Sequence, residues 1–197
     1  MKTFLSRVSL PGPWAARQGF SNPYRLHQWI WDALPADPEA RRDFLFRADS
    51  ANGVVRVLLL SERPPAPSAD FAWETTKLSP TFLFHPAYRF RLRANPTYRR
   101  ASDRRRLGYF HEPDIRAWFE RKFAAAGCDL RSLETTAPRR IRFSKRPGAP
   151  QSVISSVDAS GILSVRDESA FRAAFDSGFG HAKGFGFGLL MLQPVQP

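Results

Sequence analysis

Two side chains suited to acid–base chemistry lie three positions apart in the segment SNPYRLHQWIW, residues 21–31. They are Tyr24 and His27, and this spacing places them on one face of a helix. Histidine is the side chain that most readily moves protons near neutral pH, and a tyrosine hydroxyl can hold another hydroxyl in place. The pair therefore indicates a candidate proton-transfer site. Taken alone, such a pair is more often an aromatic flank that covers a neighbouring element.

Positive charge is concentrated in two blocks of the sequence. RFRLRANPTYRRASDRRR (89–106) carries eight arginines against Asp103, and RRIRFSKR (139–146) carries five basic residues and no acid. Arginine binds phosphate through two parallel hydrogen bonds, and the interleaved Tyr98 and Phe143 offer surfaces on which bases stack. The two blocks predict nucleic-acid binding; a merely solvated surface is the alternative.

A glycine-rich segment, GFGHAKGFGFGLLML (178–192), contains five glycines within eleven residues. It lacks the Gly-Lys-Ser/Thr of a Walker loop, and the strand expected after it does not fit a dinucleotide-binding fingerprint, which needs a helix there. Gly180 and Gly184 allow backbone N–H groups to approach a phosphate closely, and Lys183 adds a point charge. A tight turn packed against a neighbouring element is the alternative.

The composition excludes several other classes of chemistry. Of 197 residues 43% are apolar, the formal net charge is +12, and Cys128 is the only cysteine. The four histidines have no metal-ligand spacing, so we expect neither a metal nor another cofactor. No stretch approaches the roughly 20 apolar residues of a membrane-spanning helix. We therefore expect a soluble, cytoplasmic protein with no membrane partner.

The helix that carries the Tyr-His pair has clear boundaries. Ser21 or Asn22 is the expected N-cap, Pro23 lies in the first turn, and Pro35 ends the helix. Apolar residues at i, i+3, i+4, i+7 and i+8 predict a core-facing stripe that comprises Leu26, Trp29, Ile30, Ala33 and Leu34.

The remaining pattern predicts two α+β halves, at residues 1–95 and 96–197. In the first, this helix lies among strands expected at 3–10, 43–49, 54–61 and 88–94. The order of these elements is βαββαβ-like, but the second helix has only a weak signal in the sequence. The second half has helices expected at 112–126 and 167–175, and strands near 129–135, 139–145, 152–158, 162–166 and 187–192.

Four motifs follow one another along nearly the whole chain. They are NPY-x-x-H from Asn22, FLFR from Phe44, FRLRANPTYR from Phe90 and G-x-G-x-x-K-x-F-G-x-G-L-L from Gly178. Each is weak alone, but together, in this order and at these spacings, they are specific. The sequence resembles the CRISPR-associated endoribonuclease family CasE, also called Cse3, the repeat-processing subunits of type I-E Cascade.

The resemblance implies an α+β fold of two tandem ferredoxin-like (RRM-like, βαββαβ) domains with a basic hairpin and a glycine-rich loop. It implies cleavage of CRISPR precursor RNA at the base of the repeat hairpin, without metal, to 2′,3′-cyclic phosphate and 5′-OH ends. It also implies retention of the crRNA stem-loop, association with other Cascade subunits and a role in antiviral defence.

The resemblance also assigns roles to residues. His27 matches the catalytic histidine of the family, Tyr24 its active-site tyrosine, and block 139–146 the basic hairpin that holds the RNA stem. The RNA-binding candidates are Arg139, Arg140, Arg142, Lys145, Arg146, Arg99, Arg100, Lys183, Gly180 and Gly184.

The helix departs from some relatives after His27. It continues QWIWD (28–32), without the basic residue that some relatives place on this turn. The cation that steadies the scissile phosphate is therefore left open. The alternative functions are a subunit that binds and caps the crRNA stem-loop without cutting it and a structural subunit that assembles on neighbouring Cas proteins.

Overall fold

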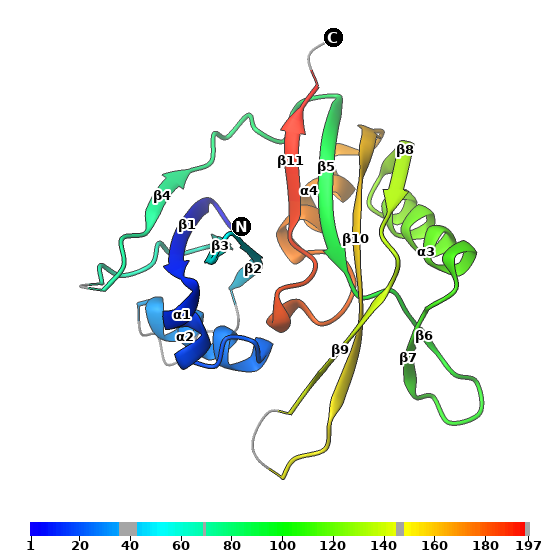
Figure 1. Ribbon diagram of the computed structural model, residues 1–197. Coiled ribbons are helices and arrows are strands. Elements are labelled where there is room, and N and C mark those ends of the chain that lie inside the picture. The colour runs from blue at the N-terminus through cyan, green and yellow to red at the C-terminus, as the bar shows by residue number, and fades with distance from the viewer. Residues whose placement is uncertain (36–42, 69, 145–147, 196–197) are drawn as a thin grey trace. The chain divides into compact units, whose positions relative to one another are not determined.

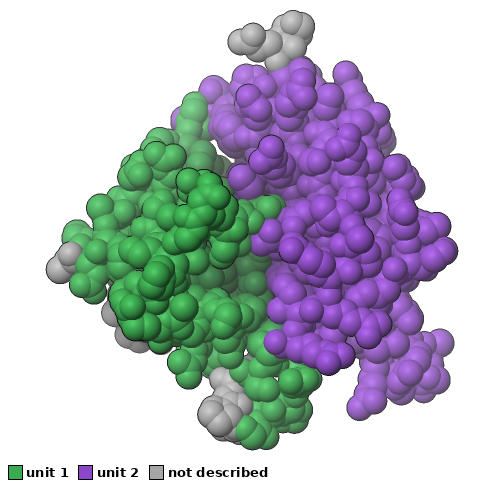
Figure 2. Space-filling view, viewed as in Figure 1, with its two compact units in different colours: residues 1–79, 143–152, 184–186 green, residues 80–142, 153–183, 187–197 purple. Residues whose placement is uncertain are grey.

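The computed structural model describes residues 1–35, 43–68, 70–144 and 148–195 of the chain. They fall into two compact units, coloured separately in Figure 2. Unit 1 comprises residues 1–79, 143–152 and 184–186, and unit 2 comprises residues 80–142, 153–183 and 187–197. Two short segments from the C-terminal half of the sequence therefore belong to unit 1.

Unit 1 contains a sheet of four strands in the order β2-β3-β1-β4, with antiparallel neighbours (Figure 1). The strands are β1 (Phe4–Pro11), β2 (Phe44–Ala51), β3 (Val54–Ser61) and β4 (Glu74–Lys77). Between β2 and β3, Asn52 and Gly53 have positive φ of 51° and 72°. Two such residues make the tight turn that matches the twist of a hairpin.

Helices α1 (Gly12–Arg17) and α2 (Pro23–Ala33) lie between β1 and β2 in the chain. Leu26, Ile30 and Leu34 of the predicted stripe are buried, and Trp29 packs partly buried against the same core. The sheet contributes the other core residues, which are Val8, Leu10, Phe44, Phe46, Val57 and Leu59. Full burial of one aliphatic side chain contributes about 1.5–3 kcal/mol, so the stripe anchors α2 to the sheet.

Unit 2 is built on a sheet in the order β11-β5-β10-β8, with antiparallel neighbours, and β9 pairs with β10 beside this path. Its strands are β5 (Ala87–Ala94), β8 (Cys128–Thr135), β9 (Arg139–Phe143), β10 (Ser152–Val165) and β11 (Leu190–Pro194). A separate pair is formed by β6 (Thr97–Arg99) and β7 (Arg106–Gly108). The helices of unit 2 are α3 (Glu112–Ala125) and α4 (Glu168–Ser177). The 3-10 turn η1 (Lys183–Phe185) begins in unit 2 and continues into the segment 184–186 of unit 1.

Both long helices of unit 2 cover the same face of its sheet. Tyr88 and Phe90 are buried and, two residues apart on β5, point to one face. The Phe90 ring lies 4.7 Å from the Phe123 ring on α3, and the Tyr88 ring lies 5.5 Å from the Phe171 ring on α4. Arg89, between them, points to the opposite, exposed side.

The strand expected at 88–94 is present as β5, but its assignment to the first half is wrong. It pairs with β10 and β11 in the second sheet. An alternating pattern determines which side chains share a face but does not identify the partner strand. The edge position in the first sheet is taken by β4, whose sequence ETTK is exposed throughout and has no apolar alternation.

The two strands expected at 152–158 and 162–166 form one continuous strand, β10. Gly161, inside this strand, lies where a neighbouring backbone approaches closely. A Cβ at this position would lie 2.1 Å from the Ser132 carbonyl oxygen. Gly161 therefore allows β10 to pair closely with β8 rather than ending the strand.

Candidate functional site

Helix α2 begins with a side-chain cap that fixes the backbone at Tyr24. The structure selects Asn22 as the N-cap, and its Oδ1 accepts a hydrogen bond from the Tyr24 N–H at 3.0 Å. Pro23 follows in the first turn, where no backbone donor is needed. Tyr24 is half-buried and precedes His27 by one turn on the same flank of the helix.

The imidazole of His27 is half-buried among aromatic rings. Its ring centroid lies 5.4 Å from that of Phe44 and 6.4 Å from that of Phe46, with interplanar angles of 28° and 23°. The Trp31 ring lies 6.1 Å away on the next turn of α2. This packing fixes the orientation of the imidazole while part of the side chain remains in contact with solvent.

Residues 184–186 of the glycine-rich segment belong to unit 1 and contact the same aromatic group. Gly186 has a φ of +85°, and a Cβ at this position would lie 3.2 Å from the Phe46 ring. The neighbouring Phe185 ring lies 4.7 Å from the ring of Phe143, the last residue of β9. Unit 1 thus brings together the Tyr-His helix, the end of a basic strand and part of the glycine-rich segment.

The arginines of β9 have different surroundings. Arg140 and Arg142 are exposed and, two residues apart on a strand, share one face. The guanidinium of Arg140 lies 4.4 Å from the centroid of the Phe110 ring, a cation–π contact. Arg139 points to the other face and forms an ion pair with Asp158 at 3.3 Å. The other two basic candidates of this block, Lys145 and Arg146, lie outside the described residues.

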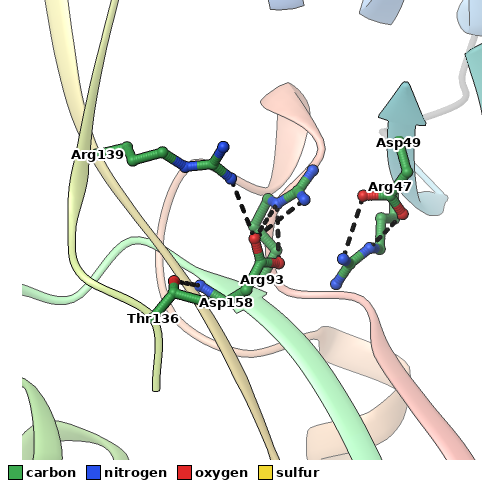
Figure 3. Close-up of polar contacts among 6 residues, drawn as sticks. All are labelled: Arg47, Asp49, Arg93, Thr136, Arg139 and Asp158. Carbon is green, nitrogen blue, oxygen red and sulfur yellow. Dashed lines mark hydrogen bonds and ion pairs between the residues drawn. The ribbon is translucent and has the colours of Figure 1, made fainter. Parts of the chain in front are cut away.

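One carboxylate in unit 2 binds two arginines, as Figure 3 shows. The Asp158 carboxylate lies 3.1 Å from Arg93 Nε and 3.3 Å from Arg139 Nη2. The Asp158 N–H donates to Thr136 Oγ1 at 3.1 Å, which fixes the backbone at this point. Asp158 therefore offsets part of the positive charge that the sequence assigned to Arg139.

Two further arginines also have acidic partners. Arg47 of the FLFR motif, in unit 1, pairs with Asp49 at 2.7 Å (Figure 3). In unit 2, Arg100 Nε donates to Asp103 at 3.0 Å. This hydrogen bond raises the pKa of Arg100 and lowers that of Asp103. Arg99, beside it, is exposed on β6.

A second histidine, His181, lies among cations in unit 2. Its Nδ1 is 3.2 Å from the Arg106 Nη1. Partial burial, followed by the positive charges of Arg106, Lys122, Lys183 and Arg99, lowers the pKa of His181 below its ordinary value of 6.5. This imidazole is therefore mainly neutral at pH 7, and the charges around it would favour a bound anion.

The glycine-rich segment has structural roles of its own. Lys183 Nζ donates to the Ser177 carbonyl at the end of α4, at 2.6 Å. Gly180 has a φ of +74°, and a Cβ there would lie 2.9 Å from the Trp118 ring, so Gly180 is a tight turn packed against α3. Gly184 lies within η1. An RNA-binding role of these three residues stays a prediction.

The described residues contain little that suits other chemistry. Among them, no group of three or more His, Cys, Asp or Glu side chains converges on a point where a metal ion could bind. Cys128 is buried, and burial raises the pKa of its thiol to about 12, so it is a poor nucleophile at neutral pH. None of the helices in the described ranges is long and apolar enough to cross a membrane.

Comparison with known proteins identifies the family of this chain. The sequence profile of a family described as CRISPR associated protein matches residues 3–194. The Cascade subunit CasE of Escherichia coli strain K12 is 31% identical over 98% of this chain and 100% of its own length. The chain belongs to the CasE/Cse3 family. The CRISPR-associated endoribonuclease Cse3 of Thermus thermophilus is 29% identical over 93% of the chain and 96% of its own length.

Solved structures of CasE/Cse3 proteins have the same α+β fold. Cas6e of E. coli K-12 superposes with a TM-score of 0.76 at 27% identity, over 98% of this chain and 100% of its own. Cse3 of T. thermophilus, bound to an RNA that represents a pre-cleavage complex, superposes with a TM-score of 0.82 over the same shares. At 24% identity the second comparison shows the fold alone.

Two contacts of this CasE/Cse3 chain had not been predicted from its sequence. One is the pair of ion pairs that Asp158 makes with Arg93 and Arg139. Its only signal in the sequence is that Asp158 is the single acidic residue between residues 151 and 158. The other is a hydrogen bond of 2.9 Å from Asn22 Nδ2 to the Ser144 carbonyl. Asn22 was expected as one of two candidate N-caps and as the first residue of the NPY-x-x-H motif, and its second bond was missed because sequence patterns reveal caps but not partners 122 residues away.

Proposed function

We propose that this chain is an endoribonuclease that cleaves CRISPR precursor RNA at the base of the repeat hairpin, without a metal ion, and then stays bound to the crRNA. The observation that carries the proposal is the convergence in unit 1 of the Tyr24–His27 helix with Gly186 and Phe46. The family supports it, because the T. thermophilus relative is an endoribonuclease and the E. coli relative is a Cascade subunit.

RNA supplies its own nucleophile for this reaction. The 2′-oxygen forms a bond to the adjacent phosphorus, and the bond from phosphorus to the 5′-oxygen breaks. A proton leaves the 2′-OH and a proton reaches the 5′-oxygen, so the products are a 2′,3′-cyclic phosphate and a 5′-OH. The protein has to align these atoms, move the protons and stabilise the added negative charge.

His27 is the residue that we assign to proton transfer, as base for the 2′-OH or as acid for the 5′-oxygen. General acid–base catalysis by one positioned group typically contributes about 10²–10⁴-fold. The rings of Phe44 and Phe46 hold the imidazole in one orientation, which supports this role. Tyr24, one turn earlier, orients the 2′-OH or a phosphate oxygen through its hydroxyl.

The basic residues would hold the RNA stem. Side chains read little sequence in the deep major groove of A-form RNA, so most contacts should go to phosphates. Arg140 and Arg142 are best placed among the described residues of the basic hairpin, because they are exposed on one face of β9. Arg139 contributes less, because Asp158 already pairs with it.

The proposed partners are the crRNA stem-loop and other subunits of Cascade, and the proposed location is the cytoplasm. The proposed architecture is two ferredoxin-like units. It is supported by the orders of the strands in the two sheets, β4-β1-β3-β2 and β11-β5-β10-β8. When the strands of each sheet are numbered 1 to 4 in chain order, both sheets have the order 4-1-3-2.

A second candidate is a subunit that binds and caps the stem-loop without cutting it. The observation that favours it is the segment QWIWD after His27, which carries no lysine or arginine. Cleavage would then lack a cation from this turn to stabilise the scissile phosphate.

Incubation of a cognate repeat hairpin with the protein in EDTA distinguishes the two candidates. The proposed endoribonuclease cuts at the base of the hairpin, leaves a cyclic phosphate and co-elutes with its product on gel filtration. Retention of uncut RNA would support the capping subunit. Cleavage that stops in EDTA and returns with magnesium would reject the proposed mechanism.

A further inference from the structure

The carboxamide of Asn22 makes two hydrogen bonds with opposite ends. Oδ1 accepts from the Tyr24 N–H at 3.0 Å, and Nδ2 donates to the Ser144 carbonyl at 2.9 Å. The first bond caps helix α2, and the second reaches a residue 122 positions later in the chain. We call the second contact the cap–hairpin bond.

The cap–hairpin bond lies next to the arginines proposed to hold RNA. Ser144 follows the last residue of β9, and Arg142 is only two residues before it. Phe143, between them, is 5% exposed and packs its ring 4.7 Å from that of Phe185. The chain immediately after Arg142 is therefore fixed within unit 1 by one hydrogen bond and one ring contact.

Capping alone does not account for this arrangement. An aspartate or serine at position 22 would cap the helix as well as asparagine does. An aspartate has no donor for the Ser144 carbonyl, and a serine offers one oxygen atom on a shorter side chain for both partners, whereas the amide has an acceptor for Tyr24 and a separate donor for Ser144. The two bonds of Asn22 thus set the position of the Tyr24 backbone relative to the end of β9.

We propose that Asn22 is a positioning residue, which rests on the proposed endoribonuclease function. Through the cap–hairpin bond, the end of β9, where Phe143 and Ser144 belong to unit 1, is kept in register with Tyr24 and His27, and so is RNA held at that end. In-line attack requires the 2′-oxygen, the phosphorus and the leaving oxygen to be aligned, and a displacement of about 1 Å can cost 10²-fold in rate. The side chain acts through the two elements it joins and has no contact with the reacting atoms.

Two substitutions remove the cap–hairpin bond and retain the cap. Asn22→Asp keeps an acceptor for the Tyr24 N–H but presents a carboxylate oxygen to the Ser144 carbonyl. Asn22→Ser keeps a capping oxygen on a shorter side chain and adds no charge. Ser21→Asp is the matched control, because it adds the same charge at an exposed neighbouring position.

The test measures three quantities for each variant: the melting temperature, the Kd for an RNA with a 2′-deoxy block at the cut, and the single-turnover cleavage rate at saturating protein. We expect both Asn22 variants to melt within about 2 °C of the wild type and to bind RNA within about twofold. We expect their cleavage rates to fall about tenfold, the effect of losing one well-placed hydrogen bond. Ser21→Asp should cut at the wild-type rate.

Three results would overturn the proposal. Cleavage by both Asn22 variants at the wild-type rate would reject the positioning role, and so would equal losses of affinity and rate. A rate loss shared by Asn22→Asp and Ser21→Asp but absent from Asn22→Ser would assign the effect to charge. Failure of the wild-type protein to cut would instead reject the proposed function, and the positioning role with it.

Discussion

The two histidines best placed for function have contrasting surroundings. His27 in unit 1 is half-buried, and the rings of Phe44, Phe46 and Trp31 lie 5.4–6.4 Å from its own. His181 in unit 2 is exposed and lies 3.2 Å from a guanidinium nitrogen of Arg106. The first is held by aromatic packing, and the second lies beside a guanidinium among several cations.

The difference indicates that the two histidines suit different roles, one in proton transfer and the other in RNA binding. Aromatic packing fixes the orientation of an imidazole, which proton transfer in a defined geometry requires. Partial burial, and after it the nearby cations, lower the pKa of the other imidazole, and those cations would favour a phosphate beside it. We therefore assign chemistry to His27 and affinity to the surroundings of His181. The following variants test that division.

The largest effect is expected from His27→Asn, which keeps a planar polar side chain of similar size. The single-turnover cleavage rate should fall by about 10²–10⁴-fold, because proton transfer is lost. The Kd for the repeat hairpin should change less than about twofold. His111→Ala, an exposed histidine beside Asp114, is the control and should cut normally. Equal losses of affinity and cleavage would contradict the assignment.

A smaller effect, on affinity alone, is expected from the double variant Arg140→Ala/Arg142→Ala. Removal of one phosphate contact should reduce the slope of log K against log salt by about 0.7–0.9. The Kd should rise at low and high salt, whereas the cut site should not move. Arg121→Ala/Arg131→Ala, exposed elsewhere in unit 2, removes the same charge as a control. An unchanged Kd and salt slope would indicate that residues 99–106, rather than β9, bind the RNA stem.

A more modest loss is expected from Tyr24→Phe, which removes only the hydroxyl. Cleavage should slow about tenfold or less, because one hydrogen bond to the substrate is removed and His27 still transfers the proton. The cap from Asn22 uses the backbone N–H, so the melting temperature should not change. A loss as large as that of His27→Asn would show that the hydroxyl itself takes part in proton transfer.

The smallest effect concerns pH. Because the pKa of His181 is lowered below 6.5, the imidazole is neutral at pH 7 and gains a proton as the pH falls. A phosphate nearby favours the charged form, so RNA binding takes up a proton and strengthens with falling pH. Between pH 7.5 and 5.5 the Kd should fall by a few-fold, and His181→Gln should remove this dependence. The same pH dependence in the variant would assign the effect to another group.

Local signals in the sequence predicted much of the fold. The stripe of α2 and the Asn-Gly turn of β2–β3 depend on neighbouring residues only, and both were predicted. The partner of β5 was not, because alternation assigns faces rather than neighbours. Strand β4 was missed because its residues are polar and exposed.

The same limit applies to the candidate site. A spacing of three residues was enough to pair Tyr24 with His27. The partners of Arg139 and Lys183 depend on tertiary contacts, with Asp158 and with the Ser177 carbonyl respectively. Counting basic residues therefore overestimated the charge that is available to RNA.

The proposed mechanism depends on the RNA's own 2′-OH as the nucleophile. The most direct test replaces that hydroxyl by hydrogen in a cognate repeat hairpin, at the nucleotide 5′ to the mapped cut, with EDTA present. We expect no cleavage of the 2′-deoxy RNA and a Kd within about twofold of that of the unmodified hairpin. Cleavage of the modified RNA at the same bond would reject this mechanism, because attack would then come from water or from the protein.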